Sequence, residues 1–147
     1  MTILKNLSIF ISHSSKDKNV FEQFVNKILV LGCGIKDSDI FCSSIAGLGI
    51  NSGENFRRLI KDKLLGCQYS FIMISNNYKQ SEVCLNEMGA SWALEHINVK
   101  QFLFPDLGFD YLRLLMNVNQ ASRINHPGAL DQLFEEFTRH NQPEKRS

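Results

Sequence analysis

Short apolar runs alternate with amphipathic stretches along most of the chain. Residues 7–12 (LSIFIS) and 69–75 (YSFIMIS) are nearly continuous apolar runs with β-branched and aromatic side chains, a pattern typical of strands buried on both faces. Weaker runs at 35–43 and 101–105 predict two further strands, and Pro105 ends the second of them. The chain therefore has at least four segments that suit the interior of a sheet.

Between these strands, apolar residues recur at the three- and four-residue spacing of a helix that is buried on one side. Ser14 and Asp17 resemble a capping box before the first helix, and Gly32 and Gly34 follow its last apolar residue. Helices are predicted at 20–31, 54–65, 81–94 and 128–140, with a weaker helical pattern at 109–117.

The alternation of strands and helices predicts an α/β domain of the flavodoxin-like three-layer kind, a central parallel sheet with helices on both faces. The 147 residues suit one domain at 1–140, followed by a polar tail at 141–147 that ends the chain or begins a linker. Ligands of such sheets bind beyond the carboxyl ends of the strands. The segments expected to meet there are 13–17, residues 42–49 with the start of the glycine-rich loop, and 76–81, which holds the loop at 76–80 and leads into the helix at 81–94.

Charge and cysteine spacing narrow the classes of function. The net charge is +1, and the densest basic set is interpreted as a solvated helix face rather than a nucleic-acid surface: Arg57, Arg58, Lys61 and Lys63. The four cysteines contain no CxxC pair, which predicts no metal site and free thiols in a reducing compartment: Cys33, Cys42, Cys67 and Cys84. No stretch suits a signal peptide or a membrane span, so we expect a cytoplasmic protein without a membrane partner.

Glu87 interrupts the apolar face of the helix at 81–94, where Cys84, Met88 and Ser91 share its side. Two interpretations stay open. A partly buried carboxylate is often a structural partner at the edge of a core. A carboxylate at the mouth of a crevice can instead bind sugar hydroxyls and stabilise a developing oxocarbenium ion. One carboxylate suffices where the leaving group departs neutral, as nicotinamide does from NAD.

Three other chemistries fit the sequence poorly. His13 follows a strand in a serine-rich loop and could belong to the catalytic triad of a hydrolase, but the sequence has no GxSxG motif for the nucleophilic serine. The stretch AGLGINSG, at 46–53, lacks the Lys and Ser/Thr of a P-loop and does not match GxGxxG. The strand at 69–75 does not end in the aspartate that a response-regulator receiver requires.

Four motifs occur in the order that is typical of one family: FISHSSKD at 10–17, IFCSSIAGLGINSGENF at 40–56, FIMISNNYKQS at 71–81 and SEVCLNE at 81–87. Together they resemble a Toll/interleukin receptor (TIR) domain of bacterial type, over about residues 7–137. The resemblance implies a five-stranded parallel flavodoxin-like domain. It also implies an NAD+ glycohydrolase that cleaves the nicotinamide–ribose bond, releasing nicotinamide with ADP-ribose or cyclic ADP-ribose, as an effector of bacterial antiphage or immune defence.

The resemblance also assigns roles to residues. Enzymatic members carry an S-x-x-C-x-x-E motif, and Ser81, Cys84 and Glu87 have that spacing. Glu87 would then be catalytic, and the substrate-binding residues would be Ser12, His13, Ser14, Ser43, Ser44 and Cys84. The loop expected to mediate self-association and activation contains Gly47, Gly49 and Gly53. NAD+ would be the substrate, no cofactor or metal is implied, and a fused or partner sensor domain that binds a cyclic nucleotide is expected.

One departure from the family pattern is Val83, where many catalytic members have an aromatic residue. Tyr78 is a candidate substitute, and Trp92 is interpreted as core. The alternative function is a non-catalytic TIR module for protein–protein interaction. A third candidate is a base-exchanging enzyme such as a nucleoside deoxyribosyltransferase, in which a glutamate is the nucleophile.

Overall fold

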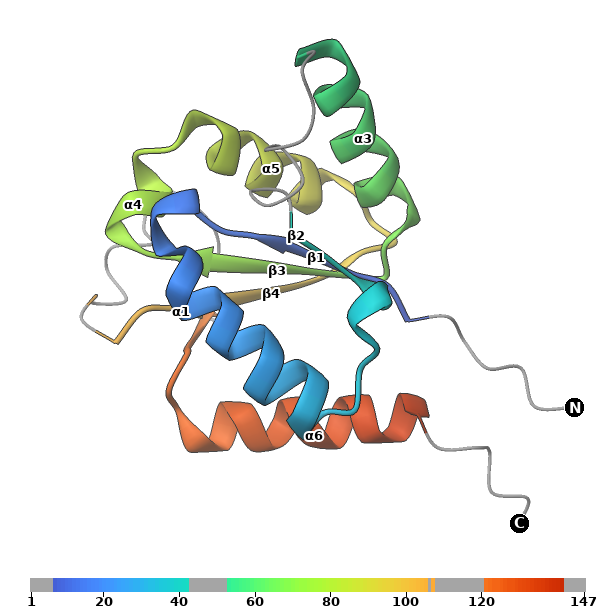
Figure 1. Cartoon of the computed structure of the whole chain (residues 1–147), viewed down its shortest axis with the longest axis vertical. Coiled ribbons are helices and arrows are strands. Elements are labelled where there is room, and N and C mark those ends of the chain that lie inside the picture. The colour runs from blue at the N-terminus through green and yellow to red at the C-terminus, as the bar shows by residue number, and fades with distance from the viewer. Residues whose placement is uncertain (1–6, 43–52, 106, 108–120, 142–147) are drawn as a thin grey trace, which may run out of the picture.

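The computed structural model describes residues 7–42, 53–105, 107 and 121–141, without the side chains of 53–56 and 139–141. The predictions for Ser43, Ser44, Gly47 and Gly49, for the helix at 109–117 and for most of the tail lie outside these residues. Figure 1 shows how the described elements are arranged around one sheet.

The five strands form one parallel sheet with the order β2-β1-β3-β4-β5. Their bounds are β1 Ile9–Ser12, β2 Ile40–Cys42, β3 Tyr69–Ile74, β4 Asn98–Leu103 and β5 Ala121–Arg123. Every residue of β1 and β3 is buried, as the continuous apolar runs predicted. The chain leaves β1 toward β2 and returns to the other side at β3, which places the topological switch point of the sheet between β1 and β3.

The helical elements connect the strands: η1 Ser15–Asp17, α1 Lys18–Gln23, η2 Phe24–Gly32, η3 Asp37–Asp39, α3 Gly53–Gly66, α4 Asn76–Lys79, α5 Glu82–Ala93 and α6 Pro127–Asn141. The segment α1 continues directly into η2, where the backbone widens to a π-helix. At its end the Cys33 amide donates to the Ile28 carbonyl at 2.9 Å, a bond between residues five positions apart.

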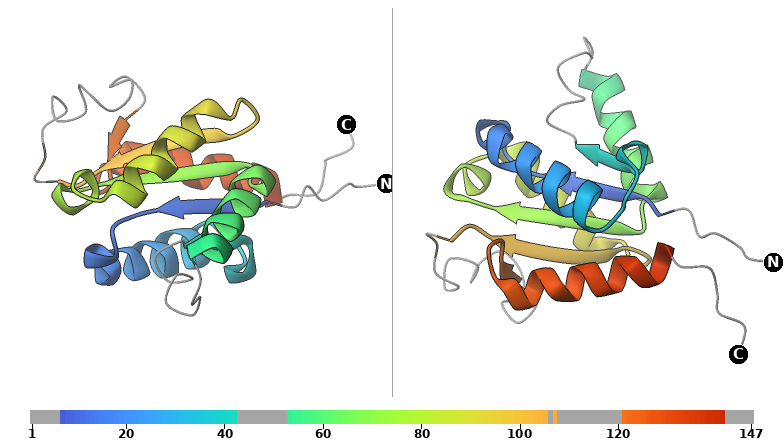
Figure 2. Two further views of the ribbon diagram at one scale, coloured as in Figure 1. Left: turned by 90° about the horizontal axis from the view of Figure 1, so that it is seen from above. Right: turned by 60° about the horizontal axis from the view of Figure 1, so that its bottom comes forward.

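Helices cover both faces of the sheet (Figures 1 and 2). On one face, side chains of α1, η2 and α6 pack with Ile11 and Phe71. On the other face, α3 and α5 pack with Phe10 and Ile72 through Leu64 and Met88. The predicted three-layer flavodoxin-like fold is therefore confirmed.

Two glycines end η2, as the sequence predicted, for two different reasons. A Cβ added to Gly32 would clash with Cε1 of Phe134, so a side chain at that position requires the Phe134 ring of α6 to shift. Gly34 has a φ of 71°, a left-handed conformation that favours glycine, and its amide donates to the Val30 carbonyl.

The structure differs from the predictions in four places. The segment 76–80 is not a loop: Ser75 caps the short helix α4, because its hydroxyl accepts the Tyr78 amide at 3.1 Å. The strand expected at 35–43 is only three residues long, β2. The strand β5 is equally short and only partly buried, so its sequence shows no apolar run that predicts a strand. Trp92 is 73% exposed, so its assignment to the core is wrong.

The described cysteines are all free; Cys42 is partly buried and the other three are buried. Among the described residues, no helix combines the length and the apolar character needed to cross a bilayer. Within the same part of the chain, no three His, Cys, Asp or Glu residues are placed to hold a metal ion.

Candidate functional site

Glu87 lies on the second turn of α5 and points into the protein. The helix begins where predicted, because the Ser81 side chain accepts the Cys84 amide at 3.2 Å. From that start, Cys84, Glu87, Met88 and Ser91 all fall on the buried face, as the sequence predicted. Since α5 packs against β1, the Glu87 side chain is only 3% exposed.

Two hydroxyl groups fix the position of the Glu87 carboxylate. The Ser12 hydroxyl, at the carboxyl end of β1, donates to Oε1 of Glu87 at 2.8 Å. The Tyr78 hydroxyl lies 2.8 Å from Ser12 Oγ and donates to the Cys84 carbonyl at 2.9 Å. Because the single Ser12 proton points to the carboxylate, the single Tyr78 proton is shared between Ser12 Oγ and the Cys84 carbonyl, as a three-centre hydrogen bond. Burial raises the pKa of Tyr78 well above its ordinary value, so this donor keeps its proton.

Asp17 ties the loop after β1 to the turn after β3. Its carboxylate accepts hydrogen bonds from the Ser75 hydroxyl and, at 2.9 Å, from the Asn77 side-chain amide. Only one half of the expected capping box forms. The Ser14 side chain caps η1 by accepting the Lys16 amide, whereas the Asp17 carboxylate bonds to Asn77 of α4. Since the Ser75 hydroxyl also accepts the Tyr78 amide, a chain of hydrogen bonds connects Asp17 with Tyr78, the residue next to the Ser12–Glu87 pair.

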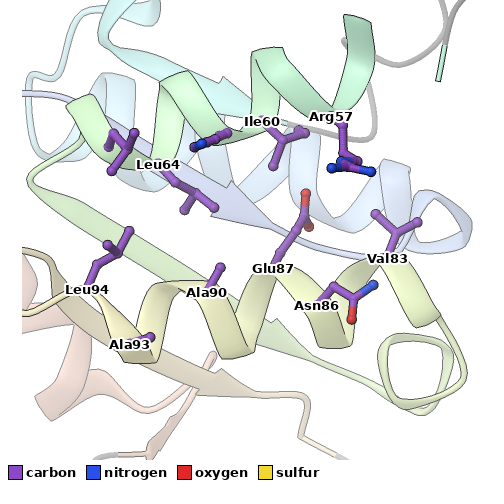
Figure 3. A pocket seen from close by; sticks show the side chains of 11 residues that line it. Arg57, Ile60, Leu64, Val83, Asn86, Glu87, Ala90, Ala93 and Leu94 are labelled. Carbon is purple, nitrogen blue, oxygen red and sulfur yellow. The ribbon is translucent and has the colours of Figure 1, made fainter. Parts of the chain in front are cut away.

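A cavity of about 570 Å³ lies between α3 and α5, a volume within the range of small-molecule sites. The lining residues are Arg57, Ile60, Lys61, Leu64, Leu65, Val83, Asn86, Glu87, Ala90, Ala93 and Leu94. In Figure 3 the Glu87 carboxylate extends from α5 toward α3, with Arg57, Val83 and Asn86 at the same end of the cavity. Leu64, Ala93 and Leu94 lie at the opposite end. The polar groups of Glu87, Arg57 and Asn86 therefore lie toward one end of a cavity that is otherwise mostly apolar.

Two of the residues expected to bind substrate, Ser12 and Cys84, are brought together with Glu87. Ser12 contacts Glu87 directly, and the carbonyl of Cys84 shares the Tyr78 hydroxyl with Ser12. The Cys84 thiol itself is buried, and this burial raises its pKa to about 11, so it stays protonated. Gly53 is the first residue of α3.

His13 lies on the opposite face of the sheet from Glu87. Side chains alternate along an extended chain, so consecutive residues at the end of β1 point to opposite faces. The His13 ring stacks on Phe21 of α1 with centroids 4.2 Å apart, and its Nδ1–H donates to the Ser14 carbonyl at 2.9 Å. Burial lowers the pKa of His13. The ring lines a second cavity of about 340 Å³, together with Glu22, Asp37 and Cys42.

Sequence reasoning missed several residues of the site. Tyr78 is fully buried and supports Glu87, so it does not replace the missing aromatic side chain in the cavity. Val83 is 51% exposed and lines the cavity at the position where many members of the family have the aromatic residue. Arg57 and Lys61 are exposed, as the interpretation of a solvated face predicted, but their spacing with Ile60 places all three on the side of α3 that also lines the cavity.

Comparison with known proteins gives a limited result. No protein-family model matches the chain. The chain is 36% identical over 131 residues to "Uncharacterized protein YddK" of Bacillus subtilis (strain 168). The aligned region covers 89% of this chain and 48% of YddK, so the chain spans about half the length of that relative.

Proposed function

We propose that this chain is a TIR-type NAD+ glycohydrolase with Glu87 as the catalytic residue. The observation that carries the proposal is the buried Glu87 carboxylate, held by Ser12 at the carboxyl end of the sheet and bordering the cavity between α3 and α5. Ligands of doubly wound sheets bind at this end, next to the switch point. A carboxylate held this way suits a reaction in which positive charge develops on a sugar.

The proposed chemistry needs one carboxylate and one nucleophile. The bond between C1′ of the ribose and the pyridinium nitrogen breaks, and its electron pair leaves with nicotinamide, which becomes neutral. The Glu87 carboxylate stabilises the oxocarbenium ion that develops at C1′, and burial strengthens this interaction because little water screens it. Water then adds to C1′ and loses a proton, which yields ADP-ribose. Attack by an adenine nitrogen of the same molecule yields cyclic ADP-ribose instead.

The proposal includes activation by self-association and a cytoplasmic location. The free thiols of Cys33, Cys67 and Cys84 are buried and suit a reducing compartment. In the family, NAD+ cleavage depends on assembly and serves defence, so we expect activity to rise with protein concentration. A sensor domain that binds a cyclic nucleotide would supply the trigger.

The test is NAD+ consumption at high protein concentration, with nicotinamide and ADP-ribose species separated by chromatography. Glu87→Gln keeps the shape of the side chain but removes its charge, and we expect it to lower turnover at least about 100-fold. Glu82→Gln is the matched control, since Glu82 is an exposed carboxylate on the same helix. Wild-type turnover in folded Glu87→Gln would contradict the catalytic assignment.

The second candidate is a non-catalytic TIR interaction module. It is favoured by Trp92 and Val83 of α5 and Leu65 of α3, which are large apolar side chains at least half exposed. The same assay separates the two candidates. Wild-type protein that forms oligomers by light scattering and consumes no NAD+ would favour the interaction module.

A further inference from the structure

We infer that Arg57 and Lys61 form a phosphate-binding subsite of the cavity between α3 and α5, so that this site selects nucleotides over nucleosides. The inference rests on the proposed function for the position of the ribose, at Glu87. It adds two specificity-determining residues and an orientation for the rest of the substrate.

The first support is the selective placement of the two cations on α3. Arg57 and Lys61 are one turn apart on this helix, and both line the cavity. Arg58 and Lys63 belong to the same helix but do not line it. The Lys63 ammonium instead lies over the Phe41 ring, 5.4 Å from its centroid. Two of the four basic residues of α3 therefore line the cavity and two do not.

The second support is the charge balance of the cavity. Among its described lining residues, Glu87 is the one acidic side chain, and its Oε1 already accepts the Ser12 hydroxyl. The ion pairs found in the described part of the chain are Lys18–Glu22 and Lys100–Glu136, so neither Arg57 nor Lys61 is paired with a carboxylate there. Two cations beside apolar walls attract an anion, and a guanidinium and an ammonium are both common phosphate ligands.

The third support is the order of groups along the cavity. Figure 3 shows Glu87 and Arg57 toward one end of the cavity and Leu64 and Leu94 toward the other. Lys61 follows Arg57 by one helical turn, about 6 Å along α3 in the direction of Leu64. A pyridine dinucleotide presents its groups in the same order: ribose hydroxyls, a diphosphate, and then adenosine. In this arrangement the diphosphate contacts Arg57 and Lys61, and the adenosine packs near Leu64 and Leu94.

The kinetic test compares NAD+, nicotinamide mononucleotide and nicotinamide riboside, which carry two, one and no phosphates. We expect Arg57→Gln and Lys61→Gln each to raise KM for NAD+ about tenfold or more, because each removes a charge-assisted hydrogen bond. Their kcat with NAD+ and their kcat/KM with nicotinamide riboside should stay near wild type. Arg58→Gln and Lys63→Gln make the same charge change on the same helix and should leave KM unchanged. An equal rise in KM for all four variants would overturn the subsite, because the effect would be one of net charge.

A binding test separates this inference from the proposed function. ADP-ribose is titrated into the wild type and the four variants by calorimetry, which requires no turnover. Weaker ADP-ribose binding in only the Arg57 and Lys61 variants supports the subsite, even for a protein that does not cleave NAD+. Cleavage of NAD+ with KM unchanged in both variants would overturn the subsite and leave the proposed function standing. Absence of both ADP-ribose binding and NAD+ cleavage would overturn both.

Discussion

Replacing Ser12 with alanine should destabilise the protein more than replacing Ser70 with alanine. The two serines are well matched: both are fully buried, on the adjacent strands β1 and β3, and both face α5. Ser12 bonds to the Glu87 carboxylate and Ser70 to the Ser91 hydroxyl, each at 2.8 Å. The two pairs differ mainly in the charge of the partner on α5.

That difference sets the expected magnitudes. A hydrogen bond to a charged group contributes about 1.5–3 kcal/mol to stability, whereas a neutral one contributes about 0.5–1.5 kcal/mol. Ser12→Ala also removes one acceptor from the Tyr78 hydroxyl, which keeps the Cys84 carbonyl. We therefore expect a loss of about 3 kcal/mol for Ser12→Ala and about 1 kcal/mol for Ser70→Ala.

The assay is urea unfolding followed by far-ultraviolet circular dichroism, with free energies obtained by linear extrapolation. Fluorescence is a poor probe here, because Trp92 is 73% exposed in the folded protein. A double-mutant cycle adds Ser12→Ala to Glu87→Gln, which makes the accepting group neutral. In that background the cost of Ser12→Ala should fall to about 1 kcal/mol.

The reasoning would be refuted by a Ser12→Ala cost no larger than that of Ser70→Ala. It would also be refuted by a Ser12→Ala cost that is the same with and without the charge on Glu87. Either result would mean that Ser12 does not hold the carboxylate.

Two further predictions concern stability away from Glu87. Gly32→Ala should lower the free energy of unfolding by about 1–3 kcal/mol, because its Cβ would meet Phe134. Gly89→Ala has nothing within 4 Å of its Cβ and should raise the free energy of unfolding by about 0.5–1 kcal/mol in the helix α5. Urea unfolding of both variants checks this, and equal effects would argue against a close approach at Gly32. Burial lowers the pKa of His13 below 6.5, so the unfolded chain binds its proton first and stability should fall as pH drops through that value. His13→Phe keeps a ring stacked on Phe21, and in this variant the free energy of unfolding should fall less between about pH 7.5 and pH 5.5. An unchanged pH dependence would contradict the claim that His13 causes the decrease.

The layers of the fold were predictable because local signals are strong there. The run at 69–75 contains no charged residue, and its polar residues are two small serines, so the pattern predicts a buried central strand. Ser81 fixed the start of α5, and helical spacing then placed Glu87 on the buried face. These signals depend on neighbours within one turn or one strand.

The site was only partly predictable because its contacts come from distant segments. The alternation of side chains along β1 already implies that Ser12 and His13 face opposite sides, although the shared motif suggested one pocket. The role of Tyr78 depends on α4, which forms because Ser75 caps it. Nothing local to Arg57 indicates that α5 lies opposite and forms a cavity with α3.

The hydrogen bonds around Glu87 also determine when the site can form during folding. The Ser12–Glu87 bond joins residues 75 positions apart, and the Ser12–Tyr78 contact joins residues 66 positions apart. Contacts of such separation require loop closure first, here the parallel pairing of β1 with β3 across a long crossover. On the ribosome, a nascent chain that stops before α5 already contains the serine and the tyrosine but not yet the carboxylate that they orient.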